Sequence, residues 1–134
     1  MNFEWTVRRA IVALGWQKNT TIRKDDLRSC HGLDGYNEAW KNQVTPRFGE
    51  RLPRIIPDWN YFKTEAYPLR HLLIHGEKTA TGVEYARDRR DSVLATSNAV
   101  AQFARSKGVD LYAPLPVRKK DLSIHDLPYL SKQA

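Results

Sequence analysis

The sequence predicts an all-α protein, and three observations support this fold class. Several stretches place apolar residues at spacings of three and four, which is the period of an α-helix. Apolar and polar residues rarely alternate one by one, so strands are not expected. The chain has 134 residues, 41% of them hydrophobic, which suits a single buried core. We therefore expect one domain over residues 1–134, built as an up-and-down helical bundle with irregular connections.

The first half of the chain predicts three helices. Residues 3–16 carry an apolar stripe at near-helical spacing, which ends at a glycine and a polar run. Thr21 is a suitable N-cap for a short helix that reaches about Cys30. Residues 31–35 contain two glycines and predict a turn. A third helix is expected over residues 36–44.

The middle of the chain predicts an irregular connection followed by a helix. Residues 45–57 contain three prolines and a glycine, which break regular structure. Asp58 is a good N-cap for the next helix. Its apolar stripe consists of Trp59, Phe62, Ala66, Leu69 and Leu73. Pro68 predicts a kink near Tyr67, or a restart with the proline in a first turn. Gly76 is the expected C-terminal cap.

The last third predicts one long helix and an arm. Residues 81–107 show the clearest helical period in the chain, and Gly108 is placed to end that helix. Residues 109–134 contain three prolines and the basic run 118–120. We expect them to form an extended C-terminal arm.

Composition and charge narrow the classes of function. The formal net charge is +7, from 22 Lys and Arg against 15 Asp and Glu. Such an excess favours a polyanionic partner, most often nucleic acid. A single cysteine, Cys30, leaves no internal disulfide and fits a reducing compartment. The sequence shows neither a secretory signal nor 18 consecutive apolar residues, so a cytoplasmic protein without membrane contact is expected.

Residues 70–76 hold the most informative short motif, Arg-His-Leu-Leu-Ile-His-Gly. The fork of donors on Arg70 can hold a phosphate, and His75 can move a proton near neutral pH. His71 lies four residues before His75, so on a helix the two imidazoles face the same way. The structural alternative is that basic residues simply favour the end of a helix.

The motif resembles the signature of HEPN domains, over roughly residues 58–107. Their hallmark is an arginine followed by a polar residue and, after four to six residues, a histidine. Arg70, His71 and His75 occupy these places, and the glycine that often follows is also present. Glu65 matches an acidic residue that some members carry, whereas Leu69 stands where those members have lysine.

The resemblance implies a metal-independent endoribonuclease that works as a homodimer without a cofactor. Arg70 would bind and polarise the scissile phosphate, and His75 would transfer a proton during attack by the ribose 2′-hydroxyl. His71 would order the site, and Glu65 would orient Arg70. The family also implies a toxin or an antiviral defence effector, controlled by an antitoxin or another regulatory protein.

Other arginines are candidates for contacts with RNA phosphates. Arg90 falls on the apolar stripe of the last long helix and could point toward the motif. Arg47, Arg51 and Arg54 form a cluster in the irregular connection, and residues 118–120 form another in the arm. Acidic residues interleave with the arginines at 87–90, so a solvated, ion-paired face is the simpler interpretation there.

Three alternatives remain open. The pair His71 and His75 could chelate a metal, but the sequence around it supplies no obvious further ligands. A HEPN-like module could bind nucleotides or proteins without catalysis. A small DNA-binding protein is the third alternative, because the turn at residues 31–35 is compatible with a helix-turn-helix. Its recognition helix would present Asn37, Lys41 and Asn42.

Overall fold

The computed structural model describes residues 3–70 and 83–129. Within these ranges the chain is helical and contains no strand, so the all-α prediction is confirmed. The elements are α1 (Phe3–Leu14), α2 (Asn19–Thr21), the π-helix η1 (Ile22–Leu27), α3 (Leu33–Gln43), α4 (Thr45–Phe48), α5 (Leu52–Ile55), α6 (Trp59–Tyr61), the π-helix η2 (Phe62–Ala66), the 3₁₀-helix η3 (Tyr67–Leu69), α8 (Val83–Ser106) and the 3₁₀-helix η4 (Ile124–Asp126). None of the described helices is long and apolar enough to span a bilayer.

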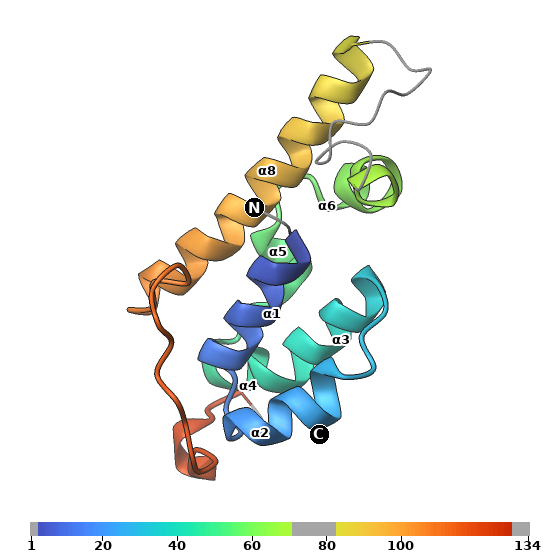
Figure 1. Cartoon of the computed structure of the whole chain (residues 1–134). Helices are drawn as coiled ribbons and strands as arrows, with labels where there is room; N and C mark the ends of the chain where they lie inside the picture. The colour runs from blue at the N-terminus through green and yellow to red at the C-terminus, as the bar shows by residue number, and fades with distance from the viewer. Residues whose placement is uncertain (1–2, 71–82, 130–134) are drawn as a thin grey trace.

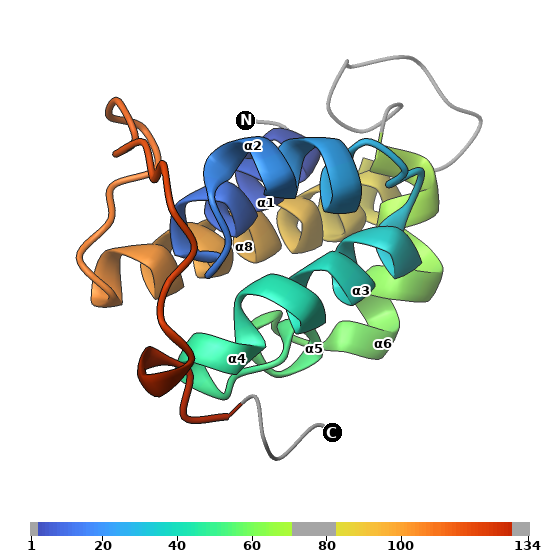
Figure 2. The ribbon, with the colours of Figure 1, turned by 90° about the horizontal axis from the view of Figure 1, so that it is seen from below.

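Helix α1 lies at the centre of the fold and packs against α8 on one side and α3 on another (Figures 1 and 2). Its predicted apolar stripe is buried, with Val7 and Ile11 fully enclosed. The largest fully buried side chains come from three different elements and are Trp40, Phe3 and Phe62. The Phe3 and Phe62 rings contact each other, the Trp40 ring contacts Phe103 of α8, and burial of these large rings favours folding.

The long helix predicted over residues 81–107 is observed as α8, and its described inner face matches the predicted stripe. Val93, Val100 and Ala104 are fully buried at spacings of seven and four, and α8 packs against α1. Gly108 follows with φ +86°, a left-handed conformation that favours glycine at the end of a helix. The prediction that this glycine ends the helix is confirmed.

Two predicted helix starts are wrong. Lys18, not Thr21, occupies the N-cap position of the second helical segment, and Thr21 lies inside the helix. The third helix begins at Leu33 rather than Tyr36, because the Tyr36 amide already donates to the Gly32 carbonyl (3.1 Å). Burial of Leu33 in the core favours this earlier start. The predicted turn at residues 31–35 is therefore shortened to its first residues.

The helical segment from residue 59 to Arg70 changes its hydrogen-bond pattern along its length. Asp58 occupies the predicted N-cap position but has φ 49° and makes no side-chain capping bond. The predicted position is therefore right, whereas the predicted capping hydrogen bond is absent. The π-turn of η2 then gives way to η3, in which Pro68 sits in the first turn. Proline cannot donate a backbone hydrogen bond, so the helix restarts there, one of the two predicted outcomes.

The residues after α8 form an arm that docks on the bundle (Figure 1). Leu111 and Leu127 are buried. Backbone bonds tie the arm to the turn after α1, since the Leu122 amide donates to the Trp16 carbonyl (2.8 Å). Farther along, the Tyr129 ring lies against Gly49, whose φ of +78° and tight space leave no room for a Cβ. The arm is thus part of the folded domain.

Candidate functional site

Arg70 lies at the end of the described helical segment and is held there by two residues. Its Nε donates to the Glu4 carboxylate in the first turn of α1, and Nη1 donates to the Tyr67 carbonyl (2.9 Å). The guanidinium carbon also lies 3.8 Å from the centre of the Tyr67 ring. About a fifth of the side chain (21%) is exposed. The guanidinium is therefore oriented in advance and still open to solvent.

The aromatic ring of Tyr67 lies beneath the Arg70 guanidinium and supports it. Its ring packs edge-on against Phe3 and Phe62 in the core, with centroid separations of 5.9 and 5.8 Å. Burial, and then the negative charge of Glu4, raise the pKa of the Tyr67 hydroxyl to about 12, although Arg70 acts in the opposite direction. The hydroxyl is therefore protonated at neutral pH, and the ring gives Arg70 an uncharged surface.

The remaining motif residues are not covered by the structure. His71, His75 and Gly76 lie outside the described residues, so the structure gives the placement of Arg70 alone among the predicted catalytic residues. Arg70 is the last described residue before that segment, and the next described residue is Val83, at the start of α8. The main chain thus leaves the Glu4–Arg70 pair directly into the predicted histidines.

Glu65 was expected to orient Arg70, but its carboxylate pairs with another arginine. Its carboxylate accepts from Arg89 Nη2 on α8 (3.0 Å), and Arg89 also lies 5.6 Å from the centre of the Tyr61 ring. Glu4 holds Arg70 instead. Nothing in the local sequence pairs Glu4 with Arg70, because they lie 66 residues apart. The only early signal was an acidic residue in the first turn of a helix.

The predicted RNA-contact arginines separate into two groups. Arg51, Arg54 and Arg90 are exposed, the first two around α5 and the third on α8. Arg47 is instead committed to the end of α1, where Nη1 donates to the Leu14 carbonyl (3.1 Å). Burial lowers the pKa of Arg47. The expected cluster of three accessible arginines is thus reduced to two by the fold.

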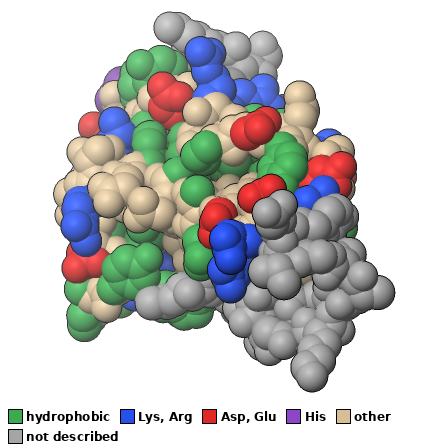
Figure 3. Space-filling model, turned by 90° about the horizontal axis from the view of Figure 1, so that it is seen from above, with side chains coloured by type: hydrophobic (Ala, Val, Ile, Leu, Met, Phe, Trp, Pro, Cys, Tyr) green, Lys and Arg blue, Asp and Glu red, His purple; other side chains and the backbone are tan. Residues whose placement is uncertain are grey.

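The basic run in the arm divides in the same way. Arg118 donates to the carbonyls of Gln17 (2.9 Å) and Ala13 (3.2 Å), near the carboxyl end of α1. Burial, and then the neighbouring Arg47 charge, lower its pKa. Lys119 and Lys120 are exposed. On the face shown in Figure 3, basic and acidic side chains are interspersed rather than gathered by sign.

The structure adds no support for the two remaining alternatives, a DNA-recognition helix in α3 and a metal site among the described residues. The outward positions of α3 include Lys41 and Asn42, but its inner face is committed to the core through Tyr36 and Trp40. Gln43, at its end, is buried and donates to Gln17 and Asp26. Among the described residues, no three His, Cys, Asp or Glu side chains form a group that could hold a metal ion.

The geometry around Arg70 therefore gives a fixed, partly exposed guanidinium that is paired with Glu4, rather than a complete catalytic centre. The guanidinium has a fixed orientation, a neutral ring beneath it and a partly exposed edge. Such a group can bind an oxyanion and stabilise charge that develops on it. Comparison with protein-family models, with curated proteins and with solved structures found no match to this chain.

Proposed function

We propose that this protein is a metal-independent endoribonuclease of the HEPN type, acting as a toxin or defence effector. The observation that carries the proposal is the Arg70 guanidinium, held by Glu4 and Tyr67 where the chain enters the segment with His71 and His75. A basic net charge of +7 suits an RNA substrate.

The reaction needs only groups that the motif contains. RNA carries its own nucleophile, the 2′-hydroxyl beside the scissile phosphate. Arg70 would neutralise the charge that builds on the phosphoryl oxygens as that hydroxyl attacks. His75 would take the hydroxyl proton or give a proton to the departing 5′-oxygen. The P–O5′ bond breaks as the P–O2′ bond forms, so the products are a 2′,3′-cyclic phosphate and a free 5′-hydroxyl.

Glu4 is a positioning residue in this scheme. Within the described part of the chain, Arg70 donates through Nε and Nη1 only, which leaves Nη2 to face a substrate oxygen. Two fixed contacts remove most of the rotamer freedom of the arginine before substrate binds. Tyr67 contributes a third contact through its ring.

The test is cleavage of a mixed RNA in the presence of EDTA. The wild type should yield fragments with 2′,3′-cyclic phosphate ends, and Arg70→Gln and His75→Ala should each lower the rate by about a hundredfold or more. Arg105→Gln is the matched control, because it removes an exposed arginine from the far end of α8. Circular dichroism must show that each variant folds. Equal activity in Arg70→Gln and Arg105→Gln would refute the proposal.

One observation favours a second candidate, a HEPN-like module that binds nucleotides or proteins without catalysis. The Glu4 carboxylate neutralises Arg70, and an ion pair that is already complete is often structural. This candidate predicts a folded wild type that leaves RNA intact over a wide range of pH and salt. Substituting Glu4 by Gln would then leave the RNA uncleaved as well.

The homodimer is a separate part of the proposal. In HEPN-type enzymes the motif helices of two subunits face each other, so one chain supplies half of a composite centre. Light scattering at micromolar concentration should therefore give twice the mass of one chain. Mixing Arg70→Gln and His75→Ala subunits should restore some cleavage if residues of both subunits meet in one centre. A strictly monomeric, active enzyme would contradict the composite centre.

A further inference from the structure

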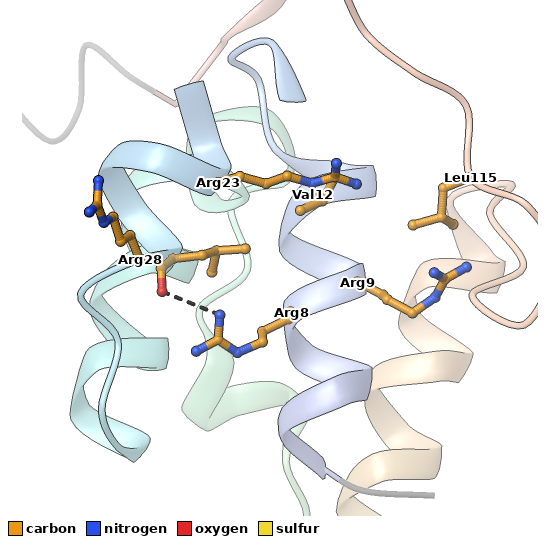
Figure 4. Close-up of a pocket in the computed structure, with 7 residues that line it drawn as sticks. Arg8, Arg9, Val12, Arg23, Arg28 and Leu115 are labelled. Atoms are coloured by element: carbon orange, nitrogen blue, oxygen red, sulfur yellow. Dashed lines mark hydrogen bonds between the residues drawn. The ribbon is translucent and has the colours of Figure 1, made fainter. Parts of the chain in front are cut away.

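A pocket lined by arginines lies between α1, the end of η1 and the C-terminal arm (Figure 4). Its volume is about 340 Å³. The residues that matter for its chemistry are Arg8, Arg9, Val12, Arg23, Leu27 and Leu115. Arg28 also borders it, but in Figure 4 its guanidinium points away from α1. Nothing in the ribonuclease proposal uses this pocket.

Two of the arginines are fixed in place by neutral partners. Arg8 donates through Nε to the Tyr36 hydroxyl (3.0 Å) and through Nη1 to the Leu27 carbonyl (3.3 Å). Arg9 donates to the carbonyls of Leu111 (2.6 Å) and Ala113 (2.8 Å) in the arm. Carbonyl and hydroxyl oxygens satisfy the donors without cancelling the charge. None of the described residues that line the pocket is acidic, so no carboxylate in its wall offsets the two positive charges.

Arg23 adds a third charge at the mouth of the pocket. The side chain is exposed, and within the described residues it makes neither a hydrogen bond nor an ion pair. Figure 4 nevertheless shows it extending from η1 toward Val12 on α1. Like charges repel, so an anion among the three guanidinium groups would stabilise this direction of the Arg23 side chain. A set of planar donor forks suits the several oxygens of a phosphate better than a single carboxylate.

The rest of the lining is aliphatic. Val12 and Leu27 are buried, and Leu115 is partly buried against the core. Ligand sites in proteins commonly combine such an apolar floor with a few charged groups, at volumes that start near 300 Å³. We propose that this pocket binds an organic phosphate of about the size of one nucleotide. Its phosphate contacts Arg23 and Arg9, and its organic body covers Val12, Leu27 and Leu115.

Two sources supply this ligand chemistry, a free nucleotide and a nucleotide within an RNA strand. Isothermal titration with ADP, with pyrophosphate and with a 2′-O-methyl oligoribonucleotide, which resists cleavage, separates them. ADP should bind more tightly than pyrophosphate, because only ADP has a body that covers the aliphatic floor. Tighter binding of ADP than of the oligonucleotide assigns the free nucleotide, and the reverse order assigns the strand.

Arg23→Gln should weaken the preferred ligand by about tenfold or more, the effect of losing a charged hydrogen bond. Lys24→Gln is the matched control, because it removes one charge from the adjacent exposed position on the same helix, and its affinity should stay within about twofold. Arg23→Lys should lie between the two, since it keeps the charge and loses the fork. Both substituted side chains are exposed, so folding should be preserved.

Four results would overturn the assignment. The first is an equal loss of affinity in Arg23→Gln and Lys24→Gln. The second is binding abolished by Arg70→Gln but not by Arg23→Gln, which would place the ligand at Arg70 instead. The third is tighter binding of an oligoglutamate peptide than of ADP, and the fourth is no binding of any phosphate probe at millimolar concentration. The pocket proposal and the ribonuclease proposal can be refuted independently, because ligand titration tests the first and RNA cleavage tests the second.

Discussion

The two ends of α1 are both covered by arginine, in opposite electrostatic settings. At the amino end, Arg70 meets the Glu4 carboxylate. At the carboxyl end, Arg47 and Arg118 meet backbone carbonyls. A helix carries partial positive charge at its amino end and partial negative charge at its carboxyl end. An arginine is therefore stabilised directly at the carboxyl end, whereas at the amino end it needs an acidic partner.

This difference separates a structural arginine from one that can take part in chemistry. Arg118 cannot leave its carbonyls without exposing unsatisfied acceptors in a partly buried place. Arg70 is bound through a side-chain carboxylate and retains an exposed edge, so a phosphate can join the pair without dismantling the helix. The side chain at each end of α1 is an arginine with the same positive charge. The group to which it donates hydrogen bonds therefore decides whether it is structural or available for chemistry.

Breaking the carboxyl-end contacts should have the largest effect on stability. Arg118→Met removes two hydrogen bonds between a charged donor and carbonyls, and it loosens the arm. We expect the free energy of unfolding to fall by about 2–3 kcal/mol in urea denaturation. Lys119→Met, at an exposed neighbouring position, is the control and should change it little. A loss below about 0.5 kcal/mol in Arg118→Met would show that water satisfies these carbonyls equally well.

At the amino end, Tyr67 should make stability depend on alkaline pH. Its pKa is about 12 in the folded state and near 10 when unfolded, so the unfolded chain loses this proton first. Its contribution is complete below pH 10 and is lost as pH rises from about 10 toward 12, by up to about 2 kcal/mol. Ultraviolet absorbance of tyrosinate reports the titration. Tyr67→Phe should remove one high-pKa transition, and an unchanged profile would contradict its assignment to Tyr67.

Glu4→Gln tests the ion pair itself. Removing the carboxylate charge should cost about 1 kcal/mol, because the pair is partly exposed and solvent screens it. The same substitution should lower the pKa of Tyr67, since Glu4 is one of the groups that raise it. The second effect distinguishes loss of the local charge from a general loss of packing. A stable variant with an unchanged Tyr67 titration would show that Glu4 does not act on this site.

The smallest effect is expected for the exposed pair Lys63–Asp34. Its atoms lie 3.8 Å apart and both side chains are largely solvated. Lys63→Ala should therefore change the free energy of unfolding by less than about 0.5 kcal/mol. Thermal melts at low and high salt measure this directly. A loss as large as that of Glu4→Gln would mean that burial does not distinguish the two pairs.

The parts of the fold that the sequence predicted well are those with long, regular patterns. The helices expected over residues 3–16 and 81–107 are observed as α1 and α8, because an apolar stripe has one way to face a core. Short elements were predicted less well. Thr21 and Asp58 were both expected as caps, yet neither caps with its side chain, because Thr21 has helical and Asp58 left-handed backbone angles instead of the extended ones of a cap.

The candidate site was predictable only in part. Arg70 stands out in the sequence because its chemistry and spacing to His75 are local properties. Its partner Glu4 does not, because the contact joins the first turn of α1 to a segment 66 residues later. The expected partner Glu65 lies five residues before Arg70 along the chain, but the π-turn and the restart at Pro68 intervene. Spacing rules for a regular helix do not hold across such a break.

By itself the sequence determined the helical class, the long helices, the basic balance and the motif at Arg70. These follow from residue types and short-range periodicity, which act before any distant contact forms. Tertiary structure alone decided which of the 22 basic side chains serve the fold and which stay available. Arg47 and Arg118 became caps for α1, Arg8 and Arg9 line a pocket, and Arg70 pairs with Glu4. The physical reason is that the role of a guanidinium depends on the group to which it donates hydrogen bonds, and packing between distant segments determines which group lies within reach.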